Sequence, residues 1–191
     1  MFTLKECKDM VLSLIDEYSV DGQLIGEADN MDYLNRIPML VNILQMEWCR
    51  LVRMPTSYTI THGEVEALYT MPSDFMEIDK IVKENCEGIY VLNWPDRKTL
   101  KLSATESGTY TIHYFKYPTK LTSTSPNTTE LDICDEAANI SPFKIAALLF
   151  QSEKPETSRL LLDIYNSEKK MVINRQTYEP QSVQRAFSIG G

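Results

Sequence analysis

The stretch Thr109-Tyr110-Thr111-Ile112-His113-Tyr114-Phe115-Lys116-Tyr117 carries the clearest strand pattern in the chain and decides its fold class. Because successive side chains of a strand point to opposite faces, Tyr110, Ile112 and Tyr114 share one face of this segment. Gly108 precedes the run and Pro118 follows it, and both residues are typical of turns. The pattern therefore predicts a strand over residues 108–118.

Shorter extended segments precede this strand. Clusters of β-branched, aromatic or alternating residues, set between turn-forming residues such as Gly63 and Pro72, predict five of them: Tyr58–Thr61, Ala67–Thr70, Met76–Val82, Ile89–Leu92 and Thr99–Leu102. Pro72 has no backbone N–H, which disfavours a central sheet position at that point. Several short strands joined by turns predict a small antiparallel sandwich or open barrel.

The N-terminal flank has the pattern of two helices. Thr3 followed by Glu6 predicts a capping box, and the helix after it is expected to end near Asp21-Gly22. Its apolar stripe comprises Leu4, Cys7, Val11, Leu14 and Tyr18. A second helix is expected from about Asp32 to Arg53, with an apolar face of Leu34, Ile37, Val41, Leu44, Trp48 and Leu51.

Two features qualify the second helix. Pro38 lies inside its pattern, so the helix is expected either to kink there or to begin afresh with Pro38 in its first turn. Met39, Ile43 and Met46 widen the apolar stripe. A stripe of this width favours a helix that is buried on two sides over one that lines a ligand site.

The C-terminal flank also has the pattern of two helices. The polar linker Leu121–Thr129 leads to a third helix between Asp135 and Gln151, which begins either at Asp135 or at Ser141-Pro142. A fourth helix is expected from Pro155 to about Asn174, with Leu160, Leu161, Ile164, Tyr165, Met171 and Val172 facing inward.

These segments predict an α+β fold with an inserted β region. Residues 1–57 and 130–175 are expected to form a helical core, a four-helix platform with two N-terminal and two C-terminal helices. Residues 58–122 are expected to form the small antiparallel β-sandwich or barrel inserted into it. Residues 176–191 show no periodicity and are predicted to be a C-terminal arm.

Composition narrows the functional classes. The chain has 191 residues and a formal net charge of −8 without basic runs, which disfavours a general nucleic-acid binder. No run of about 18 apolar residues is present, so no membrane span is predicted. The first residues lack the apolar core of a secretory signal, and we expect a cytosolic protein. Its four cysteines, Cys7, Cys49, Cys86 and Cys134, are expected to be core thiols.

Few residues suggest chemistry. His62 and His113 lie in or beside predicted strands, and structural roles are expected for both. The acidic run Asp132–Glu136 is interpreted as a helix start in preference to a cation site. Glu64 and Glu66 share a face on a strand edge; they match a pair of glycosidase carboxylates, but an acidic edge that blocks strand pairing is the simpler interpretation. We therefore predict no catalytic, cofactor or metal site, and not an enzyme.

The order of these elements resembles the head-to-tail adaptor (connector) proteins of tailed bacteriophages. Four stretches carry the resemblance: Asp32–Arg36 at the second helix, Tyr69–Ile78 with its Pro-x-Asp-Phe turn, Tyr110–Pro118 with Leu121, and Ile145–Phe150 followed by Arg159–Tyr165. Each motif is degenerate, but their order is fairly specific. The resemblance covers the chain except for about its last fifteen residues.

The resemblance implies a structural virion protein with no cofactor. About twelve copies would form a ring on the portal, in the neck between head and tail, after assembly in the host cytoplasm. The implied partners are the portal ring, further copies of the chain, and tail or tail-terminator (stopper) proteins. Genomic DNA would pass through the ring without specific binding, and a net charge of −8 suits such a channel.

Two further expectations remain open. Tyr178, Arg185 and Phe187 in the arm are candidate anchors on the portal or on a neighbouring copy. The alternative function is a β-sandwich recognition module for a glycan or a protein on a helical stalk, with Tyr90 and Trp94 as an exposed platform.

Overall fold

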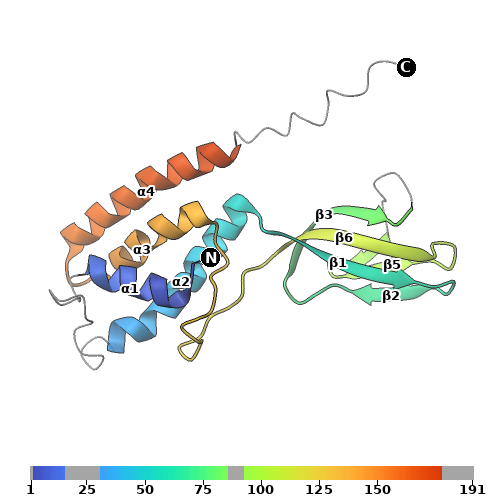
Figure 1. Cartoon of the computed structure of the whole chain (residues 1–191), viewed down its shortest axis with the longest axis horizontal. Helices are drawn as coiled ribbons and strands as arrows, with labels where there is room; N and C mark the ends of the chain where they lie inside the picture. Colours follow the sequence, from blue (N-terminus) through green and yellow to red (C-terminus); the bar gives the residue numbers. More distant parts are fainter. Residues whose placement is uncertain (1, 16–30, 86–92, 178–191) are drawn as a thin grey trace, which may run out of the picture. The chain divides into compact units, whose positions relative to one another are not determined.

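The structure is a computed structural model that describes residues 2–15, 31–85 and 93–177. It divides into two compact units, a helical unit of Met1–Val52 with Lys120–Gly191 and a β unit of Arg53–Thr119. The described helices all belong to the first unit and the described strands to the second (Figure 1). Among the helices described, none is long and apolar enough to cross a membrane. The predicted α+β class is confirmed.

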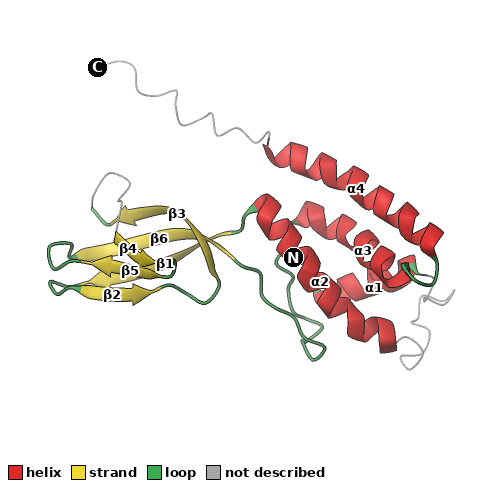
Figure 2. Ribbon diagram, turned by 180° about the vertical axis from the view of Figure 1, so that it is seen from behind, coloured by secondary structure: helices red, strands yellow, loops and turns green. Residues whose placement is uncertain are grey.

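In the part of the chain that the structure describes, the helical unit contains four helices (Figure 2). They are α1 (Leu4–Leu14), α2 (Met31–Val52), α3 (Asp135–Phe150) and α4 (Pro155–Thr177). Helix α3 packs against each of the other three, and its apolar residues join theirs in one core. At the centre of this core the rings of Trp48 and Tyr165 meet edge to face, with their centroids 6.4 Å apart.

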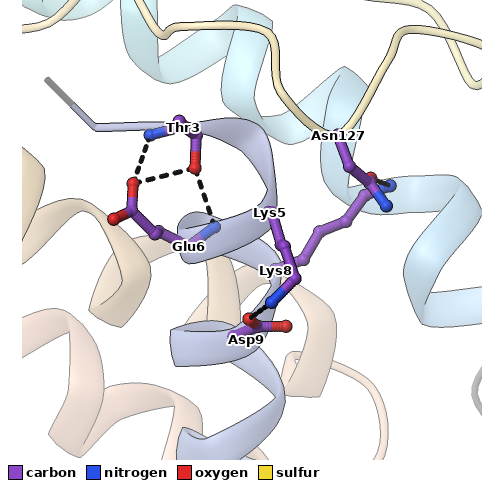
Figure 3. A network of polar contacts seen from close by, with 6 residues as sticks. All are labelled: Thr3, Lys5, Glu6, Lys8, Asp9 and Asn127. Carbon is purple, nitrogen blue, oxygen red and sulfur yellow. Dashed lines mark hydrogen bonds and ion pairs between the residues drawn. The ribbon is translucent and has the colours of Figure 1, made fainter.

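The capping box predicted at the start of α1 is confirmed (Figure 3). The Glu6 carboxylate accepts from the Thr3 backbone N–H at 2.7 Å, while the Glu6 N–H donates to the Thr3 hydroxyl at 3.2 Å. The N–H groups of Leu4 and Lys5, in the first turn of the helix, donate to the carbonyl oxygens of Thr129 and Asn127, respectively. The polar linker thus satisfies donors that an N-terminal turn leaves without intrahelical partners.

Helix α1 ends earlier than predicted. Ile15 leaves the helical conformation, with φ −102° and ψ 13°, and buries its side chain in the core. The predicted end near Asp21-Gly22, and Tyr18 of the predicted stripe, lie outside the described residues.

Pro38, the expected kink or new start of the second helix, and Pro142, in the later of the two predicted starts of the third, both lie inside helices. Helix α2 continues through Pro38, and α3 begins at Asp135, the earlier of the two predicted starts, and continues through Pro142. Both prolines are buried, so tertiary packing outweighs their unfavourable helix preference here. Beside Pro142, the Ser141 hydroxyl donates to the carbonyl of Ala137 at 2.6 Å.

Several apolar residues predicted to face inward are exposed. Leu51 of α2 and both Leu160 and Met171 of α4 lie on the outer surface of the chain. The second side of α2 is also open, because Met39 is 64% and Ile43 54% exposed. The prediction that α2 is buried on two sides is therefore wrong for the single chain.

Over its described residues, 53–85 and 93–119, the β unit forms two three-stranded antiparallel sheets with the orders β1-β6-β3 and β2-β5-β4. The strands are β1 (Pro55–His62), β2 (Ala67–Thr70), β3 (Phe75–Lys83), β4 (Asn93–Asp96), β5 (Thr99–Leu102) and β6 (Gly108–Lys116). Side chains of both sheets form one core, in which Tyr110, Ile112 and Tyr114 of β6 are buried as their alternation predicted. The segment Ile89–Leu92, a predicted strand, lies outside the described residues.

Candidate functional site

The three residues predicted to anchor a partner, Tyr178, Arg185 and Phe187, lie outside the described residues. The candidate site is therefore sought among the surfaces of the described part of the chain.

His62 has a structural position. It is buried at the end of β1, where its Nε2 lies 2.8 Å from the carbonyl oxygen of Ser103 and its Nδ1 lies 3.0 Å from the hydroxyl of Tyr69. The contact with a carbonyl requires a proton on Nε2, so Nε2 donates to Ser103. Both ring nitrogens thus join segments of the β unit.

The acidic residues considered for catalysis or metal binding are not gathered into a site. Glu64 and Glu66 lie in the turn between β1 and β2, not on a strand, and Glu66 pairs with Lys101 at 2.9 Å. Asp135 and Glu136 occupy the first turn of α3, where negative charge favours the helix dipole. Within residues 2–15, 31–85 and 93–177, no group of three His, Cys, Asp or Glu residues could hold a metal ion.

Trp94 does not form the exposed platform expected of a recognition module. It lies in β4, an edge strand, and its ring stacks on Phe75 with centroids 6.1 Å apart. It packs, half-buried, against the β-unit core. Tyr90, its predicted companion, lies outside the described residues.

One candidate site is a groove between α2 and α4, which we call the α2–α4 groove. It has a volume of about 560 Å³ and is lined by Asn42, Ile43, Met46, Glu47, Arg50, Leu51 and Lys169. Ile43 and Leu51 are 54% and 43% exposed, so the groove presents apolar surface to solvent. These residues lie on the side of α2 that the wide apolar stripe marks.

Glu47 is the polar centre of this groove. Its carboxylate pairs with both Lys144 of α3 and Lys169 of α4, and so links three helices. Burial raises the pKa of Glu47, but the hydrogen bonds and positive charges of the two lysines outweigh this and hold the pKa below its usual value. Glu47 therefore stays ionised at neutral pH.

The aromatic pair of the core lies next to this carboxylate. Burial and the nearby Glu47 charge raise the pKa of the Tyr165 hydroxyl, and Lys144 and Lys169 both lie over the Tyr165 ring. Such lysines interact favourably with the electron-rich face of the ring. The Glu47 carboxylate in the groove is thus held by two lysines, and the remaining lining includes Ile43, Leu51 and Arg50.

Sequence reasoning missed Glu47 and its two lysines. The available signal was a single carboxylate between Met46 and the buried Trp48 on a helix face that is otherwise apolar. Its partners are distant in sequence, so pairing could not be read from local spacing.

A second, smaller groove opens between α1 and α3. It has a volume of about 350 Å³ and is lined by Asp9, Met10, Ser13, Leu14 and Phe143. We call it the α1–α3 groove. It shares no residue with the α2–α4 groove, so the helical unit presents two separate apolar surfaces.

No protein-family model and no curated protein sequence matches the chain, so the function is inferred from the chain itself.

Proposed function

We propose that this chain is a structural virion protein, a head-to-tail adaptor of a tailed bacteriophage. It forms a ring of about twelve copies beneath the portal, extends the DNA channel and provides the docking surface for the tail. Its partners are the portal ring, further copies of itself, and tail or tail-terminator (stopper) proteins. Its place is the neck of the virion, reached after assembly in the host cytoplasm.

One observation carries this proposal. The two ends of the chain build a helical unit around an inserted β unit, in the order of elements that resembles the adaptor family, and that helical unit keeps an apolar groove uncovered. Exposed Ile43, Leu51 and Met39 add no buried apolar surface to a single chain. A subunit of a ring would bury such residues against its neighbours. Among the described residues, no comparable grouping of catalytic side chains competes with this interpretation.

The net charge of the chain supports a role in which the protein surrounds DNA without binding it. A net charge of −8 repels phosphate, which favours passage over retention. Within the proposal, Asp and Glu side chains of the helical unit line the channel; exposed examples are Glu156 and Asp163 of α4. Reversing several of these charges is expected to slow DNA release from the virion, and unchanged ejection kinetics would contradict this part of the proposal.

The arm supplies a second contact in the proposal. Tyr178, Arg185 and Phe187 are proposed to anchor residues 176–191 on the portal or on a neighbouring copy. Deleting residues 178–191 is expected to abolish docking while the far-UV circular dichroism of the protein stays unchanged. Normal docking by the shortened chain would remove the arm from the mechanism.

The decisive experiment is native mass measurement of the purified protein, alone and mixed with the portal ring encoded by the same genome. A portal that gains about twelve copies supports the adaptor function, whether the free protein is a monomer or a ring. A chain that stays apart from the portal at every salt concentration rules the adaptor function out. Glycan and protein screens on the β unit then test the recognition-module alternative.

A further inference from the structure

We infer that the α2–α4 groove receives helix α1 of a second copy of this chain, in a head-to-tail contact. The inference rests on the ring-forming function proposed above and assigns the two surfaces that meet in it. One copy contributes Ile43, Arg50 and Leu51, and the next contributes Asp9 and Met10.

The α2–α4 groove has the shape and chemistry of a helix-binding surface. Ile43 and Leu51 stand exposed along α2, and Lys169 of α4 closes the opposite side. Amphipathic helices bind such grooves through apolar side chains spaced three or four residues apart. The Glu47 ion pairs fix the floor, so the groove is already formed before a partner arrives.

The rim of the groove has a positive charge available for a partner. Arg50 is exposed, and it forms no ion pair with any residue that the structure describes. Among the residues that line the groove, Arg50 and Lys169 are positively charged and Glu47 alone is negatively charged. The local excess of positive charge contrasts with the net charge of −8 on the chain and favours an acidic apolar partner.

The outer face of α1 has the matching chemistry. Met10 is 37% exposed, and Leu14 and Phe143 lie beside it in the α1–α3 groove. Asp9 lies at the edge of this surface, and its one ion pair with a described residue joins it to the exposed Lys5 at 2.8 Å. An exposed pair at helical spacing is weak, so Asp9 can turn to Arg50 of a neighbour at little cost.

The two surfaces are different from each other, as the contacts of a ring require. A cyclic assembly uses heterologous contacts, in which two different surfaces of each copy meet. The grooves belong to different helix pairs, α2 with α4 and α1 with α3, so one copy can use both at once. A helix seated between two others packs ridges into grooves at an interaxial distance of about 8–10 Å.

Charge exchange tests the contact. Arg50→Glu and Asp9→Arg are expected each to weaken self-association, or loading onto the portal, about tenfold, because like charges then face each other. The double variant restores the pair and should recover association. An equal mixture of the two single variants should also recover it, because every contact between alternating copies again joins opposite charges.

Matched variants control for charge and folding. Arg36→Glu on α2 and Asp163→Lys on α4 change exposed charges outside both grooves, and neither should alter association. Ile43→Asp should weaken association without lowering the melting temperature, because Ile43 is already 54% exposed. Leu160→Asp, at a position that is 61% exposed and outside both grooves, should associate like the wild type.

The outcomes separate this inference from the proposed function. If the wild type loads onto the portal and the single charge variants load equally well, the contact is wrong while the adaptor function stands; the groove then belongs to the arm or to the portal. Loss of loading in both singles without recovery in the mixture also overturns the contact. If the wild type neither self-associates nor loads onto the portal, both the proposed adaptor function and the proposed contact are wrong.

Discussion

At the scale of single residues, polar side chains inside each unit connect its helices, strands and linker. Glu47 joins three helices, His62 joins three segments of the β unit, and Asn42 clamps the linker. The Asn42 side chain donates to the Leu121 carbonyl at 2.8 Å and accepts from the Leu121 N–H at 2.7 Å. Each of these groups forms hydrogen bonds or ion pairs with partners that are buried or half-buried.

Replacing Glu47 tests the ion-pair centre. Glu47→Gln is expected to lower the free energy of unfolding by about 1–2 kcal/mol at neutral pH, because two half-buried lysines lose their counter-charge. Since the pKa of Glu47 in the folded chain lies below its ordinary value of 4.5, this contribution is complete above that value and is lost as pH falls through the folded pKa. Urea unfolding of both proteins from neutral pH downward measures it.

Glu156→Gln provides the matched control, since Glu156 pairs with Arg159 on the exposed face of α4. Its unfolding curve should overlay that of the wild type at neutral pH. A Glu47→Gln effect that is no larger than this, or that grows as the medium becomes acidic, would contradict the role given to Glu47.

His62 offers a second test at the residue scale. His62→Leu keeps an apolar side chain of similar size but removes the donor to Ser103 and the partner of Tyr69, so we expect a loss of about 1–3 kcal/mol in unfolding free energy. His113→Gln on β6, where the side chain is only half-buried, should cost less. Equal losses in thermal unfolding of the two variants would argue against a special role for His62.

At the scale of elements, patterns local to one segment predicted the structure well. The Thr3–Glu6 box and the alternation in β6 each depend on residues a few positions apart, and both are confirmed. Neighbouring apolar residues were harder to assign, because a helix turns about 100° per residue and the helices packed around it decide whether one or both are buried. Helix α4 buries Leu161 and Val172 and exposes Leu160 and Met171, a choice that its packing partners make.

The candidate site was predictable only in part. The wide stripe of α2 was visible in the sequence, but whether Met39 and Ile43 meet another helix of the same chain depends on where α3 and α4 lie. The prolines gave a similar uncertainty, since helix preference allowed a kink or a new start at Pro38 and a late start at Pro142, whereas both rings are buried inside longer helices.

The N-terminal cap of α1 makes a test at this scale. Thr3→Ala removes the hydroxyl that accepts from the Glu6 N–H and is expected to lower the unfolding free energy by about 1 kcal/mol. Ser13→Ala removes an exposed hydroxyl in the same helix and should be neutral or slightly stabilising. Urea unfolding of the two variants distinguishes a loss of capping from a general effect of alanine.

At the scale of the whole molecule, the two ends of the inserted β unit lie in neighbouring strands. Pro55 of β1 pairs with Phe115 of β6, and the Lys116 N–H donates to the Met54 carbonyl at 3.0 Å. The two ends of the insertion are therefore adjacent, and each unit has its own apolar core. Such an arrangement allows the two units to fold separately.

Excision tests this independence. Residues 53–119 expressed alone are expected to unfold cooperatively on heating, as followed by Trp94 fluorescence, because the ring reports its stacking on Phe75. A chain in which a short Gly/Ser linker joins Val52 to Lys120 should keep the helical circular dichroism of the helical unit. An excised β unit with no cooperative transition would show that its core depends on the rest of the chain.

The interrupted helical unit also sets an order of events during synthesis. Helices α1 and α2 leave the ribosome first, but Trp48 cannot meet Tyr165 until the final helix is made. The β unit is complete once Lys116 has emerged. At roughly 5–20 residues per second, it has seconds to fold before α4 is finished. The nascent chain therefore passes through a stage in which a folded β unit follows two helices with bare apolar faces, and this is the stage at which a chaperone is most needed.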